Sequence, residues 1–242
     1  MTSAPWDWAR GGAVLVVGAS GGVGQALVDA LSSRLDGSAV LALSRQSEPA
    51  LDLLDEGCVA QAAASVHAQL RSQGRDLRLV LDATGFLHGD GHEPEKSWRQ
   101  IDPVHMARAF AINATGPALL MKHFLPLLPR DGKAVFATLS AKVGSIGDNR
   151  LGGWYSYRAS KAALNQLVHT AAIELARTRP QAVCVALHPG TVDTRLSSRF
   201  ARSGLNVQTP EEAAGRLLNV IDKLVPADTG GFLDYQGQTL PW

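Results

Sequence analysis

Residues 14–24 read Val14-Leu-Val-Val-Gly-Ala-Ser-Gly-Gly-Val-Gly24, an apolar run that leads directly into a glycine-rich turn. The apolar run is typical of a strand buried on both faces, and the residues after the turn are typical of a helix. Gly18 would make the tight turn, Gly22 would let the backbone approach a pyrophosphate, and Gly24 would let the helix pack closely on the strand. A plain glycine-rich connection is the alternative, but the position between a first strand and a helix favours a dinucleotide site.

The start of this helix would offer free N–H groups and the positive end of its dipole to an anion. We therefore expect the cofactor phosphates at the helix N-terminus. The residues expected to contact the cofactor there are Gly18, Ser20, Gly21, Gly22, Val23 and Gly24.

The end of the second predicted strand distinguishes NAD from NADP. An acidic residue there would bind the ribose 2′-hydroxyl, whereas an arginine would accept a 2′-phosphate. The segment reads Val40-Leu-Ala-Leu-Ser44-Arg45 and has no carboxylate at the turn. Ser44 can hydrogen-bond a phosphate and Arg45 can pair with it, so the sequence favours NADP(H). The alternative is a solvated loop arginine, because exposed arginines are common.

Short apolar runs alternate with longer helical patterns from one end of the chain to the other. This alternation predicts an α/β fold with one Rossmann-type, doubly wound parallel sheet of about seven strands and helices on both faces. One domain over residues 1–242 is expected, with a substrate lid near 195–209. The predicted strands are Ala13–Val17, Ala39–Leu43, Ala50–Leu53, Leu79–Leu81, Ala134–Ala137, Val183–Leu187 and Gly231–Leu233. The predicted helices are Val23–Leu35, Glu56–Gln73, Pro103–Leu128, Tyr157–Arg177 and Pro210–Leu224.

Composition narrows the class of protein. The chain has 242 residues, 45% of them hydrophobic and 19% charged, and its formal net charge is +1. The basic residues are scattered, so a nucleic-acid partner is not expected. Cys58, Cys184 and the histidines lack metal-ligand spacing, so no metal is expected. No secretory signal is visible and no apolar run approaches the roughly 20 residues of a membrane span, so we expect a cytoplasmic protein.

Tyr157 and Lys161 stand four residues apart in the run Trp154-Tyr-Ser-Tyr-Arg-Ala-Ser-Lys161. On a helix, this spacing puts a phenol and an ammonium on one face, about one turn apart. A nearby ammonium favours ionisation of the phenol, so a group with an ordinary pKa of about 10 can act as an acid and base near neutral pH. The spacing alone is weak, and a solvated helix face is the alternative.

An ordered set of motifs resembles the short-chain dehydrogenase/reductase family over essentially the whole chain. The branch with sniffer-type carbonyl reductases and C-factor-like proteins is the most similar. The motifs are Gly18-x3-Gly22-x-Gly24, Asp52-Leu53, Asp82-Ala83-Thr84-Gly85, Asn113 in Ile-Asn-Ala-Thr-Gly-Pro, Ser140-Ala-Lys-Val-Gly-Ser145, Tyr157-x3-Lys161 and His188-Pro189-Gly190-Thr-Val192-Asp-Thr194.

The resemblance implies a role for each matched residue. Tyr157 would give its proton to the substrate carbonyl, and Lys161 would lower the pKa of Tyr157 and hold the nicotinamide ribose. Asn113 would fix a water in the proton relay. The cofactor would also be contacted by Asp52 and Leu53 beside the adenine, by Ala83, Thr84 and Gly85, by Pro189, Gly190 and Val192 along the nicotinamide, and by Thr194 at the carboxamide or the phosphates.

Two positions depart from the family pattern. The usual Asn-Asn-Ala-Gly is replaced by Asp82-Ala-Thr-Gly85, which retains only Gly85 and leaves the sheet-stabilising amide contacts in doubt. The catalytic serine is also displaced, because the position thirteen before Tyr157 is Gly144. Ser140 is favoured if residues 146–153 lengthen the spacing, and Ser145 is the alternative.

The sequence therefore predicts an NADP(H)-dependent oxidoreductase that transfers hydride between the nicotinamide and a small carbonyl or alcohol substrate. The rival function is a dinucleotide-binding regulatory or signalling protein whose catalysis is vestigial. By resemblance, a homodimer or homotetramer packed through the helices around 103–128 and 157–177 is expected.

Overall fold

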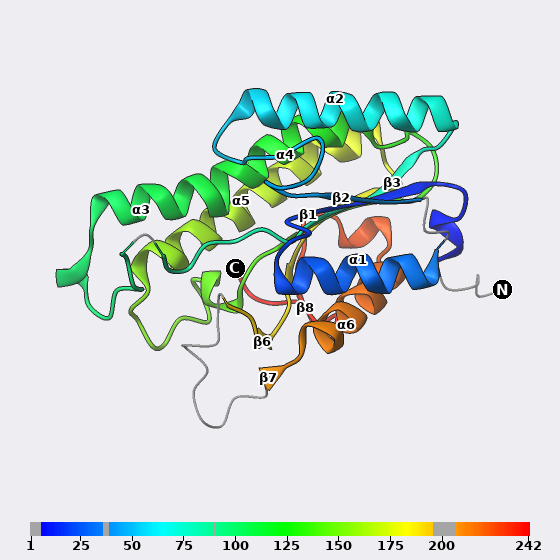
Figure 1. Ribbon diagram of the computed structural model, residues 1–242. Helices are drawn as coiled ribbons and strands as arrows, with labels where there is room; N and C mark the ends of the chain where they lie inside the picture. The colour runs from blue at the N-terminus through cyan, green and yellow to red at the C-terminus, as the bar shows by residue number, and fades with distance from the viewer. Residues whose placement is uncertain (1–5, 36–38, 90, 196–206) are drawn as a thin grey trace.

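The computed structural model describes residues 6–35, 39–89, 91–195 and 207–242. Six strands form one parallel sheet in the order β2-β1-β3-β4-β5-β8 (Figure 1). A separate parallel pair is formed by β6 and β7. The strand bounds are β1 Ala13–Val17, β2 Val40–Leu43, β3 Leu77–Asp82, β4 Ala134–Leu139, β5 Ala182–His188, β6 Thr191–Val192, β7 Val207–Gln208 and β8 Phe232–Asp234. The predicted fold class is confirmed.

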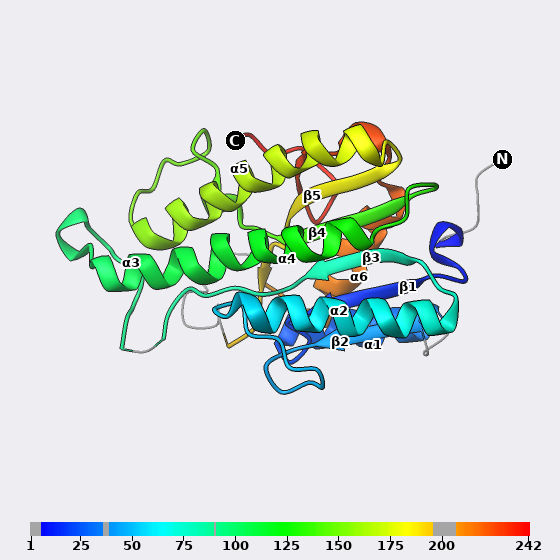
Figure 2. The ribbon, with the colours of Figure 1, turned by 90° about the horizontal axis from the view of Figure 1, so that it is seen from above.

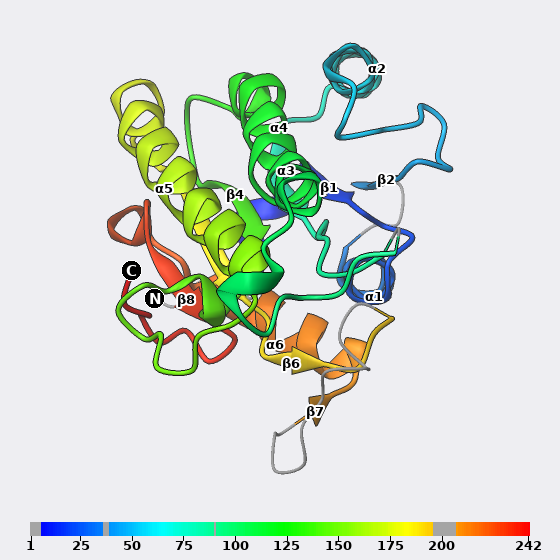
Figure 3. The ribbon, with the colours of Figure 1, turned by 90° about the vertical axis from the view of Figure 1, so that its left-hand side faces the viewer.

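Helices cover both faces of the sheet. One face carries α2 (Glu56–Gln73), α3 (Pro103–Phe110), α4 (Gly116–Phe124) and α5 (Tyr155–Thr178), and Figure 2 shows α2, α4 and α5 as three rows across it. The other face carries α1 (Gly22–Arg34) and α6 (Pro210–Lys223), as Figure 3 shows.

Each face of the sheet has its own hydrophobic core. Leu15 and Val17 of β1 belong to the core under α2, α4 and α5, and Val14 and Val16 belong to the core under α1 and α6. Successive side chains of a strand point to opposite faces, so a strand covered on both sides needs an apolar residue at every position. This requirement explains why the strands can be recognised in the sequence as continuous apolar runs.

Two predicted elements differ from the structure. The segment Ala50–Leu53 is not a strand, because the Leu51 N–H donates to the Ser44 carbonyl and the Asp52 N–H to the Cys58 sulfur, so these groups bond within their own connection. The predicted helix over 103–128 is interrupted by a π-helical turn at Ala111–Thr115. Pro117 follows this turn, and a proline ring clashes with the carbonyl four residues earlier, which forces the backbone to widen there.

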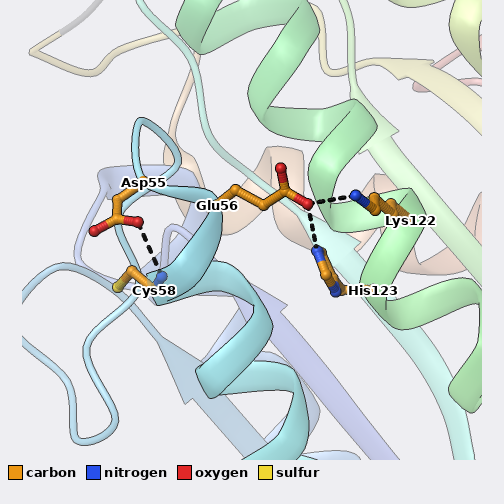
Figure 4. A network of polar contacts seen from close by, with 5 residues as sticks. All are labelled: Asp55, Glu56, Cys58, Lys122 and His123. Carbon is orange, nitrogen blue, oxygen red and sulfur yellow. Dashed lines mark hydrogen bonds and ion pairs between the residues drawn. The ribbon is translucent and has the colours of Figure 1, made fainter.

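Local capping confirms several predicted helix starts. Asp55 accepts a hydrogen bond from the Cys58 N–H at 3.2 Å, and Thr209 and Glu212 form a capping box at the start of α6. At the outer surface of α2, Glu56 pairs with Lys122 and with His123 of α4 (Figure 4). The Glu56 and Lys122 side chains are 48% and 61% exposed, so their ion pair adds little to the packing of α2 on α4. Within the described ranges, no helix is both long and apolar enough to span a bilayer.

Gly24 is where α1 approaches β1 most closely. A Cβ atom at this position would lie 2.1 Å from the Gly18 carbonyl oxygen, whereas a Cβ at Gly215 in α6 would meet nothing within 4 Å. We expect Gly24→Ala to lower the free energy of unfolding by about 3 kcal/mol, or to prevent folding, because backbone must move to relieve the clash.

The matched control is Gly215→Ala, which should raise the free energy of unfolding by about 1 kcal/mol, since alanine is the better helix former. Urea denaturation followed by circular dichroism measures both. Equal stability of Gly24→Ala and the wild type would show that α1 does not pack as closely on the turn as the structure has it.

Candidate active site

The predicted site residues follow the carboxyl ends of four neighbouring strands. The glycine-rich turn follows β1, residues 82–85 end β3 and follow it, Ser140 follows β4, and residues 189–194 follow β5. Strand order reverses between β1 and β3, because the chain runs outward to β2 and then returns past β1. In open α/β sheets the crevice at such a reversal is the usual place for a ligand.

The glycine turn is held in shape by backbone hydrogen bonds. Gly18 has a φ of 81°, and the Gly18 and Ala19 N–H groups both donate to the Leu43 carbonyl of β2, at 2.9 and 3.1 Å. Helix α1 begins at Gly22, and no side chain caps it at Gly21. Ser20, Gly21 and Gly22 are exposed, and the Gly21 N–H donates to the Gly18 carbonyl at 3.0 Å. The other N–H groups at the start of the helix are therefore the ones that could hold the pyrophosphate of a dinucleotide.

Other predicted cofactor residues lie against this turn. A Cβ atom on Gly18 would lie 3.0 Å from the Thr84 Cγ2 and 3.1 Å from the Ala83 carbonyl carbon. A Cβ atom on Gly22 would lie 3.1 Å from the Thr194 Cγ2. The structure therefore brings the segments after β1, β3 and β5 together around the start of α1.

The end of β2 presents Ser44 and Arg45 at the rim of this crevice. Arg45 is exposed, and the Ser44 hydroxyl accepts from the Gln46 N–H at 3.1 Å. Asp52 is half-buried and accepts from the Leu54 N–H, whereas Leu53 is buried. Leu53 packs on Gly116 of α4. A Cβ atom on Gly116 would lie 2.8 Å from the Leu53 Cβ, so Leu53 also positions α4.

Asn113 lies in the π-helical turn and is fully buried. Its Oδ1 accepts from the Phe86 N–H at 2.8 Å, and its Nδ2 donates to the Phe86 carbonyl at 2.7 Å and to the Ser160 hydroxyl at 3.0 Å. Ser160 belongs to α5, so this one amide ties the segment after β3 to the helix that carries Tyr157. The widened turn is what points the side chain inward.

Tyr157 and Lys161 lie one turn apart on α5, as predicted. The Lys161 Nζ donates to the Leu139 carbonyl at 2.7 Å, and the Tyr157 ring meets Trp154 edge to face, with 6.2 Å between centroids. Burial raises the pKa of Tyr157 to about 12. That Lys161 lowers the pKa of Tyr157 stays a prediction, and in this structure the Lys161 ammonium is bonded to the end of β4. Burial lowers the pKa of Lys161 itself to about 8, against an opposing effect of Asp82.

The two candidate serines differ in how their hydroxyls are used. Ser140 donates to the Asn165 Oδ1 of α5 at 2.6 Å and is buried. Ser145 is also buried, and its oxygen accepts from the Asp148 N–H at 3.0 Å, an arrangement that leaves its own proton to be donated. Gly144 beside it packs on Lys161, since a Cβ atom there would lie 2.8 Å from the lysine Cβ.

The segment after β5 is held by a side chain that sequence reasoning missed. Gly190 has a φ of 82°, and a Cβ atom on it would lie 2.2 Å from the Gln208 Nε2. Gln208 is buried and donates to the Pro189 carbonyl at 3.1 Å. Its strand, β7, pairs with β6 and holds Val192 in place. Of the predicted lid, residues 196–206 lie outside the described residues.

Residues 12–203, most of the chain, match the family model for short chain dehydrogenase. The chain belongs to the short-chain dehydrogenase family. It is 40% identical over 143 residues to C-signal of Myxococcus xanthus, covering 59% of this chain and 81% of that protein. It is 32% identical to 1-hydroxy-2-glutathionyl-2-methyl-3-butene dehydrogenase of Rhodococcus sp. (strain AD45), over 95% of this chain and 99% of that protein.

A solved structure extends the likeness to the fold. The NADPH-bound carbonyl reductase from chicken fatty liver superposes with a TM-score of 0.82 at 27% identity, covering 96% of this chain and 100% of that one. The predicted similarity to carbonyl reductases and C-factor-like proteins is confirmed. The chain thus belongs to a family of oxidoreductases, the short-chain dehydrogenases.

Glu95 is a further residue of this short-chain dehydrogenase that the sequence did not reveal. Its buried carboxylate accepts from both the N–H and the hydroxyl of Ser156, and its carbonyl accepts from the Trp154 N–H at 2.5 Å. It therefore satisfies free donors at the start of α5, next to Tyr157. No local sequence pattern predicts this contact, because Glu95 and Ser156 are 61 residues apart in the chain. In the described part of the chain, no group of three or more His, Cys, Asp or Glu side chains could hold a metal ion.

Proposed function

We propose that this short-chain dehydrogenase is an NADP(H)-dependent oxidoreductase that acts on a small carbonyl or alcohol substrate. One observation carries the proposal. Tyr157, Lys161 and Asn113 converge from α5 and the π-helical turn on the carboxyl edge of the sheet, where the glycine turn fits a dinucleotide. A proton donor beside a hydride-carrying cofactor is what carbonyl reduction requires.

The cofactor would supply the hydride, and the chain would bind and orient it. The N–H groups of the exposed residues Ser20 and Gly22 suit its pyrophosphate, whereas the Gly21 N–H already donates to the Gly18 carbonyl, and Thr194 lies against the same turn. Arg45 and Ser44 suit a 2′-phosphate at the rim. The fold neighbour from chicken is an NADPH-bound carbonyl reductase, which supports NADP(H) here. The remaining predicted contacts, from Asp52 and Leu53, from Gly85, and from Pro189, Gly190 and Val192, stay predictions.

The state of Tyr157 suits reduction. With a pKa of about 12, the phenol keeps its proton at neutral pH and can donate it to a substrate oxygen. Lys161 lies on the same face of α5 and would favour the phenolate left behind once the substrate has taken the proton. Asn113, locked by three hydrogen bonds, would order a water on the path that returns a proton to the site.

Ser145 is the better candidate for the donor that polarises the substrate carbonyl. The Ser140 proton is already given to Asn165, whereas the Ser145 oxygen is used as an acceptor. This revises the preference for Ser140 drawn from motif order. The single domain, the lid, and the homodimer or homotetramer stay predictions.

A signalling protein with vestigial catalysis is the second candidate. The 40% identity to C-signal over 143 residues favours it, as does the alanine at position 141, where the family motif carries its second serine. Intact Tyr157, Lys161 and Asn113 oppose it.

The first test is NADPH oxidation against a panel of aldehydes, ketones and quinones, followed by absorbance at the nicotinamide band. The wild type should turn over at least one carbonyl, and Tyr157→Phe should lose about 10²–10⁴-fold in kcat while still binding NADPH, because only the donated proton is removed. Binding is measured by nicotinamide fluorescence. NADPH binding without turnover of any carbonyl would favour the signalling protein.

Arg45→Ala tests the cofactor preference. Loss of one charge-assisted phosphate contact should weaken NADPH binding by about 10-fold and leave NADH binding unchanged, since NADH has no 2′-phosphate. Fluorescence titration with both cofactors measures this, and Arg150→Ala, in the loop before α5, is the matched control. An unchanged NADPH affinity in Arg45→Ala would contradict the phosphate contact.

Single alanine substitutions separate the two serines. Ser145→Ala should lower kcat by about 10²-fold, as removal of one preorganised donor does. Ser140→Ala should leave kcat within a few-fold of wild type and instead lower the free energy of unfolding by about 1 kcal/mol, because Asn165 loses its partner. Steady-state kinetics and urea denaturation on both variants check this, and the reverse pattern would restore Ser140 as the donor.

A further inference from the structure

Asp82 is a buried carboxylate at the end of β3, in the position where the family usually has asparagine. Its Oδ1 accepts from the Thr84 N–H at 3.0 Å and from the Thr84 hydroxyl at 2.6 Å. Its Oδ2 accepts from the Thr138 hydroxyl at 2.6 Å. Three donors directed at both oxygens are the arrangement that an ionised carboxylate needs, because a carboxylate has acceptors only.

The register of β3 and β4 places Asp82 beside the end of β4, which is the part of the sheet that Lys161 contacts. Asp82 and Thr138 are register partners on β3 and β4, and Leu139 is the next residue of β4. The Leu139 carbonyl accepts from the Lys161 Nζ at 2.7 Å. Asp82 and Thr138 are fully buried and Lys161 is 2% exposed, so water screens the two charges poorly.

Asp82 is the charged group that opposes the cost of burying Lys161. Burial lowers the pKa of Lys161, and Asp82 raises it. The pKa of Asp82 lies above its ordinary value, because burial raises it by more than Thr138, Thr84 and Lys161 lower it. Tyr157 on α5 is neutral at working pH because burial raises its pKa to about 12. Arg158, which lies three residues before Lys161 on α5, directs its guanidinium to the Gly153 and Val143 carbonyls.

We propose that Asp82 is a positioning residue that serves as the counter-charge of Lys161 and keeps its ammonium protonated and directed at the end of β4. Asp82 touches neither substrate nor cofactor in this role and acts only through Lys161. An asparagine at this position could accept the Thr84 hydrogen bonds through its Oδ1 and donate to the Thr138 hydroxyl oxygen through its Nδ2, but it could not supply the charge. The catalytic value of this contact rests on the proposed function, whereas the charge pairing itself does not.

The direct test is the titration of Lys161 in the protein without cofactor. Lysines labelled with ¹³C at Cε are followed by NMR between pH 6 and 11, and Lys161→Met identifies the signal. In Asp82→Asn the Lys161 midpoint should fall by about one pH unit, the low end of what a nearby opposite charge contributes. Asp29→Asn on the exposed surface of α1 removes the same charge and should leave the midpoint unchanged.

Two further measurements keep the outcome decisive. Thr138→Val removes one hydrogen-bond donor to the Asp82 carboxylate and should also lower the Lys161 midpoint, by less than Asp82→Asn does. This variant tests the proposal if Asp82→Asn does not fold. The alkaline limb of the kcat profile for carbonyl reduction should move to lower pH in Asp82→Asn and not in Asp29→Asn. An unchanged Lys161 midpoint in Asp82→Asn overturns the proposal, even if activity is lost. A lowered midpoint in a protein with no turnover supports the charge pairing and counts against the proposed function alone.

Discussion

The contact between Gly24 and the Gly18 carbonyl is the constraint on which the rest of the site depends. No side chain fits between them, so α1 packs closely on the turn of residues 18–21 that follows β1. The first N–H groups of the helix are therefore exposed at the point where the strand order reverses. Thr84 and Thr194, which follow β3 and β5, both lie against the glycine turn. A close backbone approach thus shapes the part of the protein where we propose that the cofactor phosphates bind.

Several buried polar side chains at this edge of the sheet are hydrogen-bonded within the protein, which offsets the cost of burying them. Asp82 uses Thr84 and Thr138, Asn113 uses Phe86 and Ser160, and Glu95 uses Ser156. These bonds join β3, β4, the π-helical turn and the start of α5 into one network. Because such a network is satisfied only in one arrangement, it holds Tyr157 and Lys161 in place before any ligand binds. Activity and stability are therefore linked through the same residues.

Much of the fold was predictable because its signals are local. Strands β1 and β5 are buried on both faces, so their apolar runs are unbroken, and Asp55 and Thr209 mark helix starts through hydrogen bonds within one turn. The two wrong predictions, the strand at Ala50–Leu53 and the uninterrupted helix over 103–128, have local causes that the spacing of apolar residues does not indicate. Pro117 widens the helix that carries Asn113, and Ala50–Leu53 directs its N–H groups into a loop. Glu95 and Gln208 could not be found at all, since their partners are far along the chain.

The sequence by itself determined the order of elements, the family and the spacing of Tyr157 and Lys161, because each depends on residues that are neighbours along the chain. Only the tertiary structure decided what those side chains contact. Lys161 is bonded to Leu139 and paired in charge with Asp82, and Ser140 is committed to Asn165. Burial and the pairing of buried charges depend on which strands and helices pack together in the fold. Burial and charge pairing in turn set the pKa values of the site residues, although the sequence was enough to name those residues.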